Sequence, residues 1–88
     1  MEFEWNPAKN EANIKKHGIC FEDAYQILEG SHVVFESFRD TEERWGAIGL
    51  LDNRCVIVFY TMRSTKYRII SIRRARPDEE RRYRQLYQ

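Results

Sequence analysis

The stretch from Arg54 to Ala75 constrains the fold of this chain most, because it contains two consecutive segments with the character of β-strands. Cys55 to Met62 is almost wholly apolar and rich in β-branched and aromatic residues, which is typical of a strand buried on both faces. Tyr67 to Arg74 mixes apolar residues with serine and arginine. The polar segment Ser64-Thr65-Lys66 separates the two, and we therefore expect two neighbouring strands joined by a short turn.

The second of these strands combines apolar and cationic side chains. Because side chains on a strand alternate between its faces, Ser71 and Arg73 should share one face, and Arg68 and Arg74 the other. An arginine-bearing strand beside a buried one holds cations on a rigid surface. Guanidinium groups match phosphate in geometry and charge, so we expect phosphate to be the anion bound there.

Length and composition indicate one small globular domain that spans residues 1–88. A hydrophobic share of 42% supports a folded core. No apolar run approaches the roughly 20 residues of a membrane span, and the N-terminus lacks a signal-peptide pattern. We therefore expect a cytoplasmic protein without membrane contact. The two cysteines, Cys20 and Cys55, lie in apolar settings without metal-ligand spacing and should be reduced thiols in or near the core.

Charge is distributed unevenly along a chain whose net charge is only +1. Basic residues predominate from Arg54 onward, whereas acidic residues predominate before it. This polarity suggests an anionic partner, and nucleic acid more than a membrane surface. A solvated terminal helix rich in charged residues would explain the same distribution without any partner.

The first part of the chain predicts a short strand and two helices. Glu2 to Trp5 alternates polar and apolar residues and forms the strand. The first helix runs from Pro7 to His17, with Asn6 as its N-cap and Gly18 as its C-cap. The second helix ends at Gly30, and its residues with helical spacing should form one buried stripe: Phe21, Ala24, Tyr25 and Leu28.

The middle of the chain predicts two more strands before the arginine-bearing pair. In order, we expect a strand from Val33 to Phe38, a charged turn from Phe38 to Glu43, a strand from Arg44 to Leu51 and a hairpin turn at Asp52-Asn53. Gly46 and Gly49 weaken their strand and indicate a bulge or a close backbone approach.

A last helix begins at Pro77, followed by acidic residues in its first turn. Tyr83, Leu86 and Tyr87 should form its buried stripe. The element order β-α-α-β-β-β-β-α predicts the α+β class. We expect a small antiparallel sheet built as a meander, two N-terminal helices packed on one face of it, and a C-terminal helix.

Several segments in this order resemble the BrnT family of bacterial toxins. They are Phe3-Glu4-Trp5-Asn6-Pro7-Ala8-Lys9, Asn13 to Ile19 followed by Phe21-Glu22-Asp23-Ala24, Glu43-Arg44, Tyr60-Thr61-Met62-Arg63, Arg68 to Ala75, and Glu80-Arg81 with Tyr83. Each segment alone is weakly specific, but the ordered set covers nearly the whole chain. Cys20 and Ile72 differ from the residues that are frequent at their positions in the family.

The resemblance implies a RelE-like fold and a metal-independent ribonuclease toxin that blocks translation. It also implies a cognate BrnA-type antitoxin with a ribbon-helix-helix DNA-binding part. The toxin–antitoxin complex would repress its own operon, and the toxin would reach operator DNA only through the antitoxin. The residues themselves agree on one point, since the chain has no carboxylate cluster with metal spacing and only two histidines. We expect neither a metal nor another cofactor.

RNA cleavage without a metal needs cations that neutralise the charge developing on phosphorus. Arg63 ends one of the two central strands and Arg73 lies on the next, and we predict that these two form a phosphate clamp. Arg68 is a third candidate. A surface arginine in a structural salt bridge is the alternative for each of them.

The cleavage also needs a base for the 2′-hydroxyl and an acid for the leaving oxygen. His17 is the candidate, because histidine titrates near neutral pH, although a helix-end histidine often only bonds the last carbonyls. Lys16 could stabilise charge beside it. Ser71 could donate a hydrogen bond to phosphate or simply fill the strand face. Tyr83 could stack on a base, but its helical spacing also fits a core position.

Two classes of function remain open on the sequence alone. The first is a ribonuclease toxin that uses the arginine-bearing surface. The second is a non-catalytic module that binds an antitoxin or a nucleic acid, and the absence of an unambiguous general base favours it. Cleavage of RNA, as opposed to binding without cleavage, separates the two.

Overall fold

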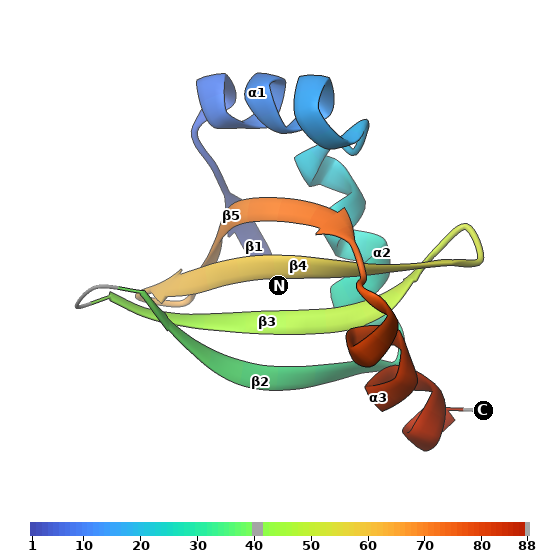
Figure 1. Cartoon of the computed structure of the whole chain (residues 1–88). Coiled ribbons are helices and arrows are strands. Elements are labelled where there is room, and N and C mark those ends of the chain that lie inside the picture. The colour runs from blue at the N-terminus through green and yellow to red at the C-terminus, as the bar shows by residue number, and fades with distance from the viewer. Residues whose placement is uncertain (40–41, 88) are drawn as a thin grey trace.

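The computed structural model describes residues 1–39 and 42–87. Its elements are β1 (Glu2–Glu4), α1 (Pro7–His17), a 3-10 turn η1 (Phe21–Asp23), α2 (Ala24–Glu29), β2 (His32–Arg39), β3 (Glu42–Leu51), β4 (Arg54–Arg63), β5 (Lys66–Arg74) and α3 (Pro77–Tyr87). The predicted α+β class is confirmed. Figure 1 shows one curved sheet with α1 above its β5 side, α2 behind it and α3 against one end of its front face.

The five strands lie in the order β1-β5-β4-β3-β2. Strands β2 to β5 form the predicted antiparallel meander. However, β1 pairs with β5 in parallel, with Glu2 opposite Lys66, so the expectation of an antiparallel sheet throughout is wrong at this edge. The chain between β1 and β5 contains two helices and three strands, and so no hairpin forces an antiparallel arrangement.

Local capping explains where α1 begins and ends. The Asn6 side chain accepts hydrogen bonds from the amides of Ala8 and Lys9 at 2.8 and 3.3 Å. At the other end Gly18 adopts a left-handed conformation with φ of 71°, and its amide donates to the Ile14 carbonyl. The bounds predicted for this helix are confirmed.

The stripe predicted for the second helix is partly wrong. Phe21, Ala24 and Leu28 are buried, but Tyr25 is 39% exposed and Ile27 is fully buried instead. The chain runs through the 3-10 turn η1 before the α-helix begins, and this change of helical repeat shifts the inward-facing positions. Tyr25 still stacks on Phe3, with ring centroids 4.0 Å apart.

The stripe predicted for the last helix is also only partly correct. Tyr83 is 5% exposed, as expected, whereas Leu86 is 67% and Tyr87 44% exposed. Figure 1 shows α3 projecting past the end of the sheet, so that its last turn has no strand to cover it. Tyr87 keeps one contact with the sheet, since its hydroxyl donates to the His32 carbonyl at 3.2 Å.

The turns of the meander are tighter than predicted. Asp52 and Asn53 both have positive φ and form the two-residue loop that was expected. Lys66 pairs with Arg63 and therefore belongs to β5, not to the preceding turn. Strands β2 and β3 remain paired into the segment predicted as the charged turn 38–43, of which residues 40–41 lie outside the described part.

Two apolar clusters lie on opposite faces of the sheet. The first joins η1 and α2 to the back of β3, β4 and β5, and its fully buried members are Phe21, Ala24, Ile27, Ala47, Val58 and Ile72. The second joins α3 to the front face and contains Ile48, Cys55, Ile57 and Tyr83. On that face Gly46 permits a close approach, since a Cβ there would lie 2.6 Å from the Phe35 ring.

A β-bulge changes which residues of β5 share a face. Phe59 lies opposite Ser71, but Tyr60 lies opposite Ile69, so the β5 chain has one extra residue between these pairs. Arg68, opposite Thr61, therefore projects to the same front face as Ser71 and Arg73. The predicted grouping of Arg68 with Arg74 is wrong, because strict alternation does not hold across a bulge.

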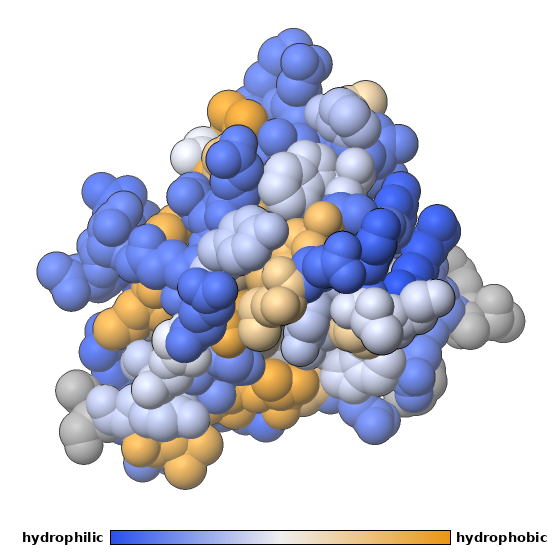
Figure 2. Space-filling model, turned by 180° about the vertical axis from the view of Figure 1, so that it is seen from behind, coloured by the Kyte–Doolittle hydropathy of each residue, from blue (hydrophilic) through white to orange (hydrophobic). Residues whose placement is uncertain are grey.

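Both cysteines are free, as expected, with Cys55 buried and Cys20 partly buried. Burial, and then the neighbouring Glu80, raise the pKa of the Cys55 thiol, which keeps it protonated. No helix among the described residues is long and apolar enough to cross a bilayer. Figure 2 shows the back of the molecule as separate apolar patches among hydrophilic side chains.

Candidate nucleic-acid interface

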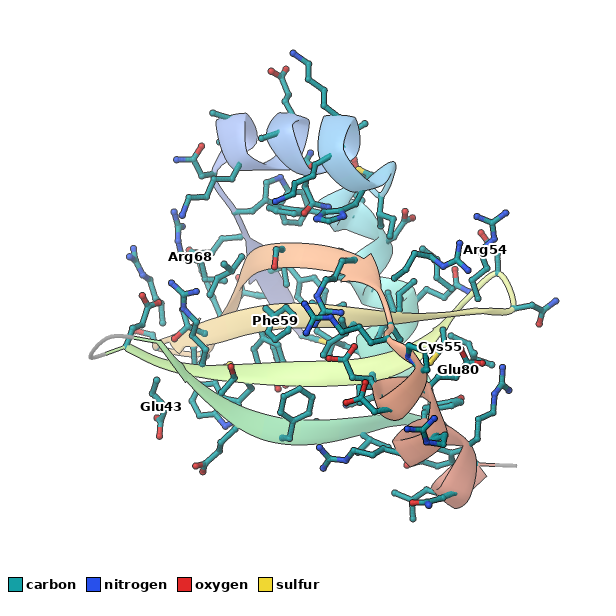
Figure 3. The ribbon with its side chains drawn as sticks, viewed as in Figure 1. Glu43, Arg54, Cys55, Phe59, Arg68 and Glu80 are labelled. Atoms are coloured by element: carbon teal, nitrogen blue, oxygen red, sulfur yellow. The ribbon has the colours of Figure 1, made fainter. Side chains whose placement is uncertain are left out.

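A hollow of about 710 Å³ lies on the front face of the sheet, and we refer to it as the front hollow. It is lined by Lys16, His17, Ser37, Arg44, Phe59, Ile70, Ser71, Arg73 and Arg76. Figure 3 shows Phe59 near the middle of this face, between α1 and α3. Residues from the four strands β2 to β5, the end of α1 and the approach to α3 thus meet at one place.

Asn13 holds α1 at the edge of the hollow. Strand β1 pairs with β5 only as far as Arg68, which leaves the outer edge of β5 beyond it without a strand partner. The buried Asn13 side chain supplies that partner: its amide nitrogen donates to the Ile72 carbonyl at 2.9 Å, and its oxygen accepts from the Ile72 amide at 3.2 Å. A further bond to the Ile19 carbonyl fixes the chain after α1.

This anchor places the last turn of α1 beside the end of β5. Lys16 is exposed and His17 is half-buried, and both line the front hollow. Ser71 and Arg73 reach it from β5. Four of the residues predicted from the sequence are therefore brought together, although α1 and β5 lie far apart in the chain.

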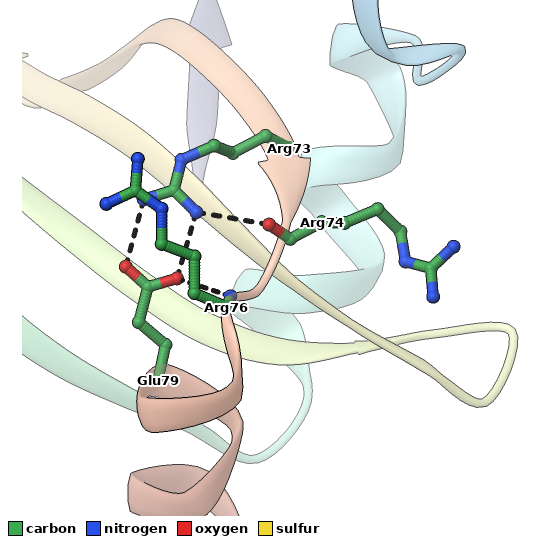
Figure 4. A network of polar contacts seen from close by, with 4 residues as sticks. All are labelled: Arg73, Arg74, Arg76 and Glu79. Atoms are coloured by element: carbon green, nitrogen blue, oxygen red, sulfur yellow. Dashed lines mark hydrogen bonds and ion pairs between the residues drawn. The ribbon is translucent and has the colours of Figure 1, made fainter.

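Arg73 is held rigidly in the hollow, as Figure 4 shows. Two parallel hydrogen bonds of 2.9 Å join its guanidinium to the Glu79 carboxylate. The same guanidinium donates to the Arg74 carbonyl at 3.1 Å and lies 5.3 Å from the centroid of the Phe59 ring. Its side chain is only 21% exposed.

Glu79 links this arginine to the start of α3. Its carboxylate also accepts from the Arg76 amide at 2.8 Å, which is the reciprocal half of a capping box. The hydrogen bonds from Arg73, and then that from the Arg76 amide, hold the pKa of Glu79 below its ordinary value, although burial opposes them. The carboxylate is thus ionised at neutral pH and orients the Arg73 guanidinium.

Sequence reasoning missed Arg44, Arg76, Ser37 and Phe59 as components of the hollow. Arg44 lies opposite Ser37 in the β2–β3 ladder. It pairs with Glu42 at 3.3 Å, and its buried Nε has no hydrogen-bond acceptor among the described residues. Knowledge of the β2–β3 strand register, which places Arg44 opposite Ser37, would have indicated Arg44 as a residue of the hollow. Arg76 lies outside any strand pattern, and no sequence signal separates it from its basic neighbours.

Three predicted residues lie elsewhere. Arg63 pairs with Lys66 at the far end of the β4–β5 ladder, whereas Arg73 pairs with Ile57, six residues along β4. At about 3.3 Å per residue this separation is about 20 Å, so the two arginines cannot clamp the same phosphate. Their use as one clamp is not supported.

Arg68 and Tyr83 also lie outside the hollow, where each contacts other residues of the protein. Arg68 forms a salt bridge of 3.0 Å with Glu4, in which both side chains are 29% exposed. Tyr83 is buried in the cluster beneath α3 and packs against Tyr87. A direct role for either residue in binding substrate stays a prediction.

The chemistry of the front hollow suits a phosphodiester. Among the described residues, its lining contains four Lys or Arg side chains and one histidine, and no carboxylate. Within residues 1–39 and 42–87, no three His, Cys, Asp or Glu side chains gather as metal ligands would. The cations and the Ser71 hydroxyl can bind phosphate oxygens, the Phe59 ring offers an aromatic surface, and a histidine can move a proton at neutral pH.

Comparison with protein families gives one match. The family model described as ribonuclease toxin, BrnT, of type II toxin-antitoxin system matches residues 5–79. The match includes α1, the whole meander and the Glu79 that holds Arg73. A comparison with individually curated proteins gave no match.

Proposed function

Because the chain belongs to the BrnT family of ribonuclease toxins of type II toxin–antitoxin systems, we propose that the front hollow is its site of RNA cleavage. The observation that carries the proposal is the convergence of Lys16, His17, Ser71 and Arg73 in one cationic hollow. We further propose that the fold is RelE-like and that the protein acts on cytoplasmic RNA to stop translation.

We propose a metal-independent mechanism. His17 takes the proton of an RNA 2′-hydroxyl, the oxygen attacks the adjacent phosphorus, and the bond to the 5′-oxygen breaks as that oxygen gains a proton from water. Arg73 and Lys16 neutralise the charge on the non-bridging oxygens, with Ser71 as a hydrogen-bond donor. Because Glu79 already fixes the Arg73 guanidinium, little reorganisation is needed when the charge develops.

Arg44 and Arg76 complete the cationic lining. Arg44 lines the front hollow, and its guanidinium can donate hydrogen bonds to a phosphate oxygen there. Arg76 is exposed and lies beside the Arg73–Glu79 pair, where it can bind a phosphate next to the one being cleaved. Both are proposed to bind RNA without transferring protons.

A type II toxin has an antitoxin, and we propose that this partner is BrnA-type, with a ribbon-helix-helix part that binds DNA. It would cover the front hollow with acidic side chains, because the hollow is cationic. The complex would repress its own operon, and only the antitoxin would contact operator DNA.

One observation favours a second candidate, a module that binds RNA or an antitoxin without cleaving. The Arg73 guanidinium already has a carboxylate, a carbonyl and an aromatic ring as partners, so its positive charge is partly neutralised. In this alternative Arg73 supports the structure and the hollow only binds.

Incubation of the purified protein with RNA in EDTA, with and without the product of the adjacent gene, tests the proposal. We expect cleavage that survives chelation and stops when the partner is added. RNA that binds but remains intact, with purified RNA and in a translating extract, would favour the binding module. Cleavage that EDTA abolishes would contradict the metal-independent mechanism.

A further inference from the structure

A second hollow, of about 400 Å³, lies on the back of the sheet and meets the front hollow at His17. We refer to it as the back hollow; it is lined by His17, Gly18, Ile19, Asp23, Leu51, Asp52, Arg54, Val56 and Arg74. The proposed cleavage does not use its two arginines. We propose that the back hollow binds the nucleotide next to the cleaved phosphodiester together with that nucleotide's second phosphate, which a dinucleotide lacks; this inference rests on the proposed function.

The end of β5 presents one arginine to each hollow. Because side chains alternate on a strand, Arg73 projects to the front and Arg74 to the back. Figure 4 shows the two side chains leaving the strand in different directions, Arg74 toward the β3–β4 hairpin. The Arg73 guanidinium also donates to the Arg74 carbonyl, which fixes the backbone between the two side chains.

The β3–β4 hairpin brings the second cation. Asp52 and Asn53 form the tight two-residue loop, and Arg54 begins β4 directly after it. Figure 3 shows Arg54 at this end of the sheet, opposite the end that carries Arg68 and Glu43. Arg54 thus faces the back hollow from the hairpin while Arg74 faces it from β5.

Both arginines are available for an anion. Each is exposed, and none of the salt bridges between described side chains includes either one. Arg73, Arg68, Arg44 and Arg84 each have a carboxylate partner. Two guanidinium groups without a carboxylate partner beside a shared hollow fit one phosphate group, which can accept hydrogen bonds from both.

Among the described residues, the lining of the back hollow includes two carboxylates, whereas that of the front hollow includes none. The Asp23 and Asp52 carboxylates line the back hollow, and they would repel a free phosphate. In contrast, a nucleotide carries hydroxyl and amino donors beside its phosphate, and carboxylates accept from these groups. The combination of arginines and aspartates therefore fits a nucleotide within a chain better than an inorganic anion.

The two hollows adjoin at His17. This histidine lies at the C-terminal end of α1, beside the β5 edge that Asn13 caps, and lines both spaces. A single RNA strand that passes His17 would place one phosphate near Arg73 and the flanking nucleotide near Arg74. Cleavage at the front would then depend on the nucleotide bound at the back.

Equilibrium binding of labelled single-stranded RNA tests this inference independently of cleavage. The probes are a dinucleotide and an RNA of about six nucleotides, each with a 2′-deoxy residue at the cleavage position. For the wild type we expect the longer RNA to bind at least about tenfold more tightly, from contacts outside the front hollow. The variant R54A/R74A should lose most of this gain and bind the dinucleotide as the wild type does.

The control variant K9A/R81A removes two exposed cations outside both hollows and should retain the gain. The salt dependence of binding to the longer RNA should also weaken in R54A/R74A, by about 0.7 in the logarithmic slope for one lost phosphate contact. If the longer RNA binds more tightly than the dinucleotide by the same factor in the wild type and in R54A/R74A, the back hollow is not a subsite. Failure of the wild type to cleave any RNA would contradict the proposed function instead.

Discussion

At the scale of single residues, Asn13 decides where the proposed catalytic side chains lie. Its amide performs for Ile72 what a neighbouring strand would do, because it binds both the N–H and the C=O of that residue. Asn13 is 6% exposed and has no charge, so it contributes through these bonds and not through solvation or long-range electrostatics. The position of Lys16 and His17 over the end of β5 follows from this one side chain.

The variant Asn13→Ala should lower the free energy of unfolding by about 2 to 4 kcal/mol. It leaves the buried amide and carbonyl of Ile72 and the carbonyl of Ile19 without their partner, and each unsatisfied group costs about 1 to 3 kcal/mol before the structure relaxes. Urea denaturation measures this loss. Glu11→Ala, an exposed change on the same helix, should cost less than about 0.5 kcal/mol. Equal stability of the two variants would show that Asn13 does not anchor α1.

At the scale of elements, α3 and β5 are joined through one carboxylate. Glu79 caps the first turn of α3 at the Arg76 amide and pairs with Arg73 on the strand. The helix is thus oriented by the same contact that fixes the proposed phosphate-binding cation. Its exposed last turn, with Leu86 67% accessible, adds little to this attachment.

The variant Glu79→Gln should reduce stability at neutral pH by about 1.5 to 3 kcal/mol, the range for hydrogen bonds to charged groups. The folded-state pKa of Glu79 lies below its ordinary value of 4.5, so the ionised carboxylate contributes stability above that pH. This contribution is lost as the pH falls from about 4.5 through the lower folded-state value. Denaturation between about pH 5 and pH 3 should therefore show a steeper loss for the wild type than for Glu79→Gln.

Asp78→Asn provides the matched control for this measurement, because Asp78 is an exposed acid in the same turn of α3. It should keep the steep wild-type dependence on pH. Parallel curves for the wild type and Glu79→Gln would mean that the Arg73–Glu79 pair does not stabilise the folded state.

At the scale of the whole molecule, local sequence patterns predicted where helices, strands and turns lie along the chain better than how these elements contact one another. The cap at Asn6, the left-handed Gly18 and the Asp52-Asn53 turn follow from short-range chemistry and were predicted correctly. Strict alternation failed on β5, because the bulge opposite Phe59 has no signature in the sequence. Tyr25 was misassigned since the switch from 3-10 to α-helix alters the phase of the buried stripe.

The same holds for the candidate site: its residue types could be predicted from the sequence, but their arrangement in space could not. Arg73, Ser71 and His17 could be singled out from residue type, but a hairpin puts Arg63 and Arg73 at opposite ends of their ladder. Arg44 joins the front hollow only through strand register, which depends on tertiary pairing. The sequence therefore predicts which groups can do the chemistry, whereas their convergence depends on contacts between distant segments.

The rate of RNA cleavage in EDTA by the wild type and by two single variants of the front hollow tests the central claim most directly. His17→Ala should lose at least about 100-fold, the usual contribution of a general acid or base. Lys16→Ala, an exposed change that should not disturb folding, should lower the rate by a smaller factor. The control K9A/R81A should cleave at the wild-type rate, and circular dichroism establishes that every variant is folded. Wild-type rates for folded His17→Ala and Lys16→Ala would contradict the claim that the front hollow cleaves RNA.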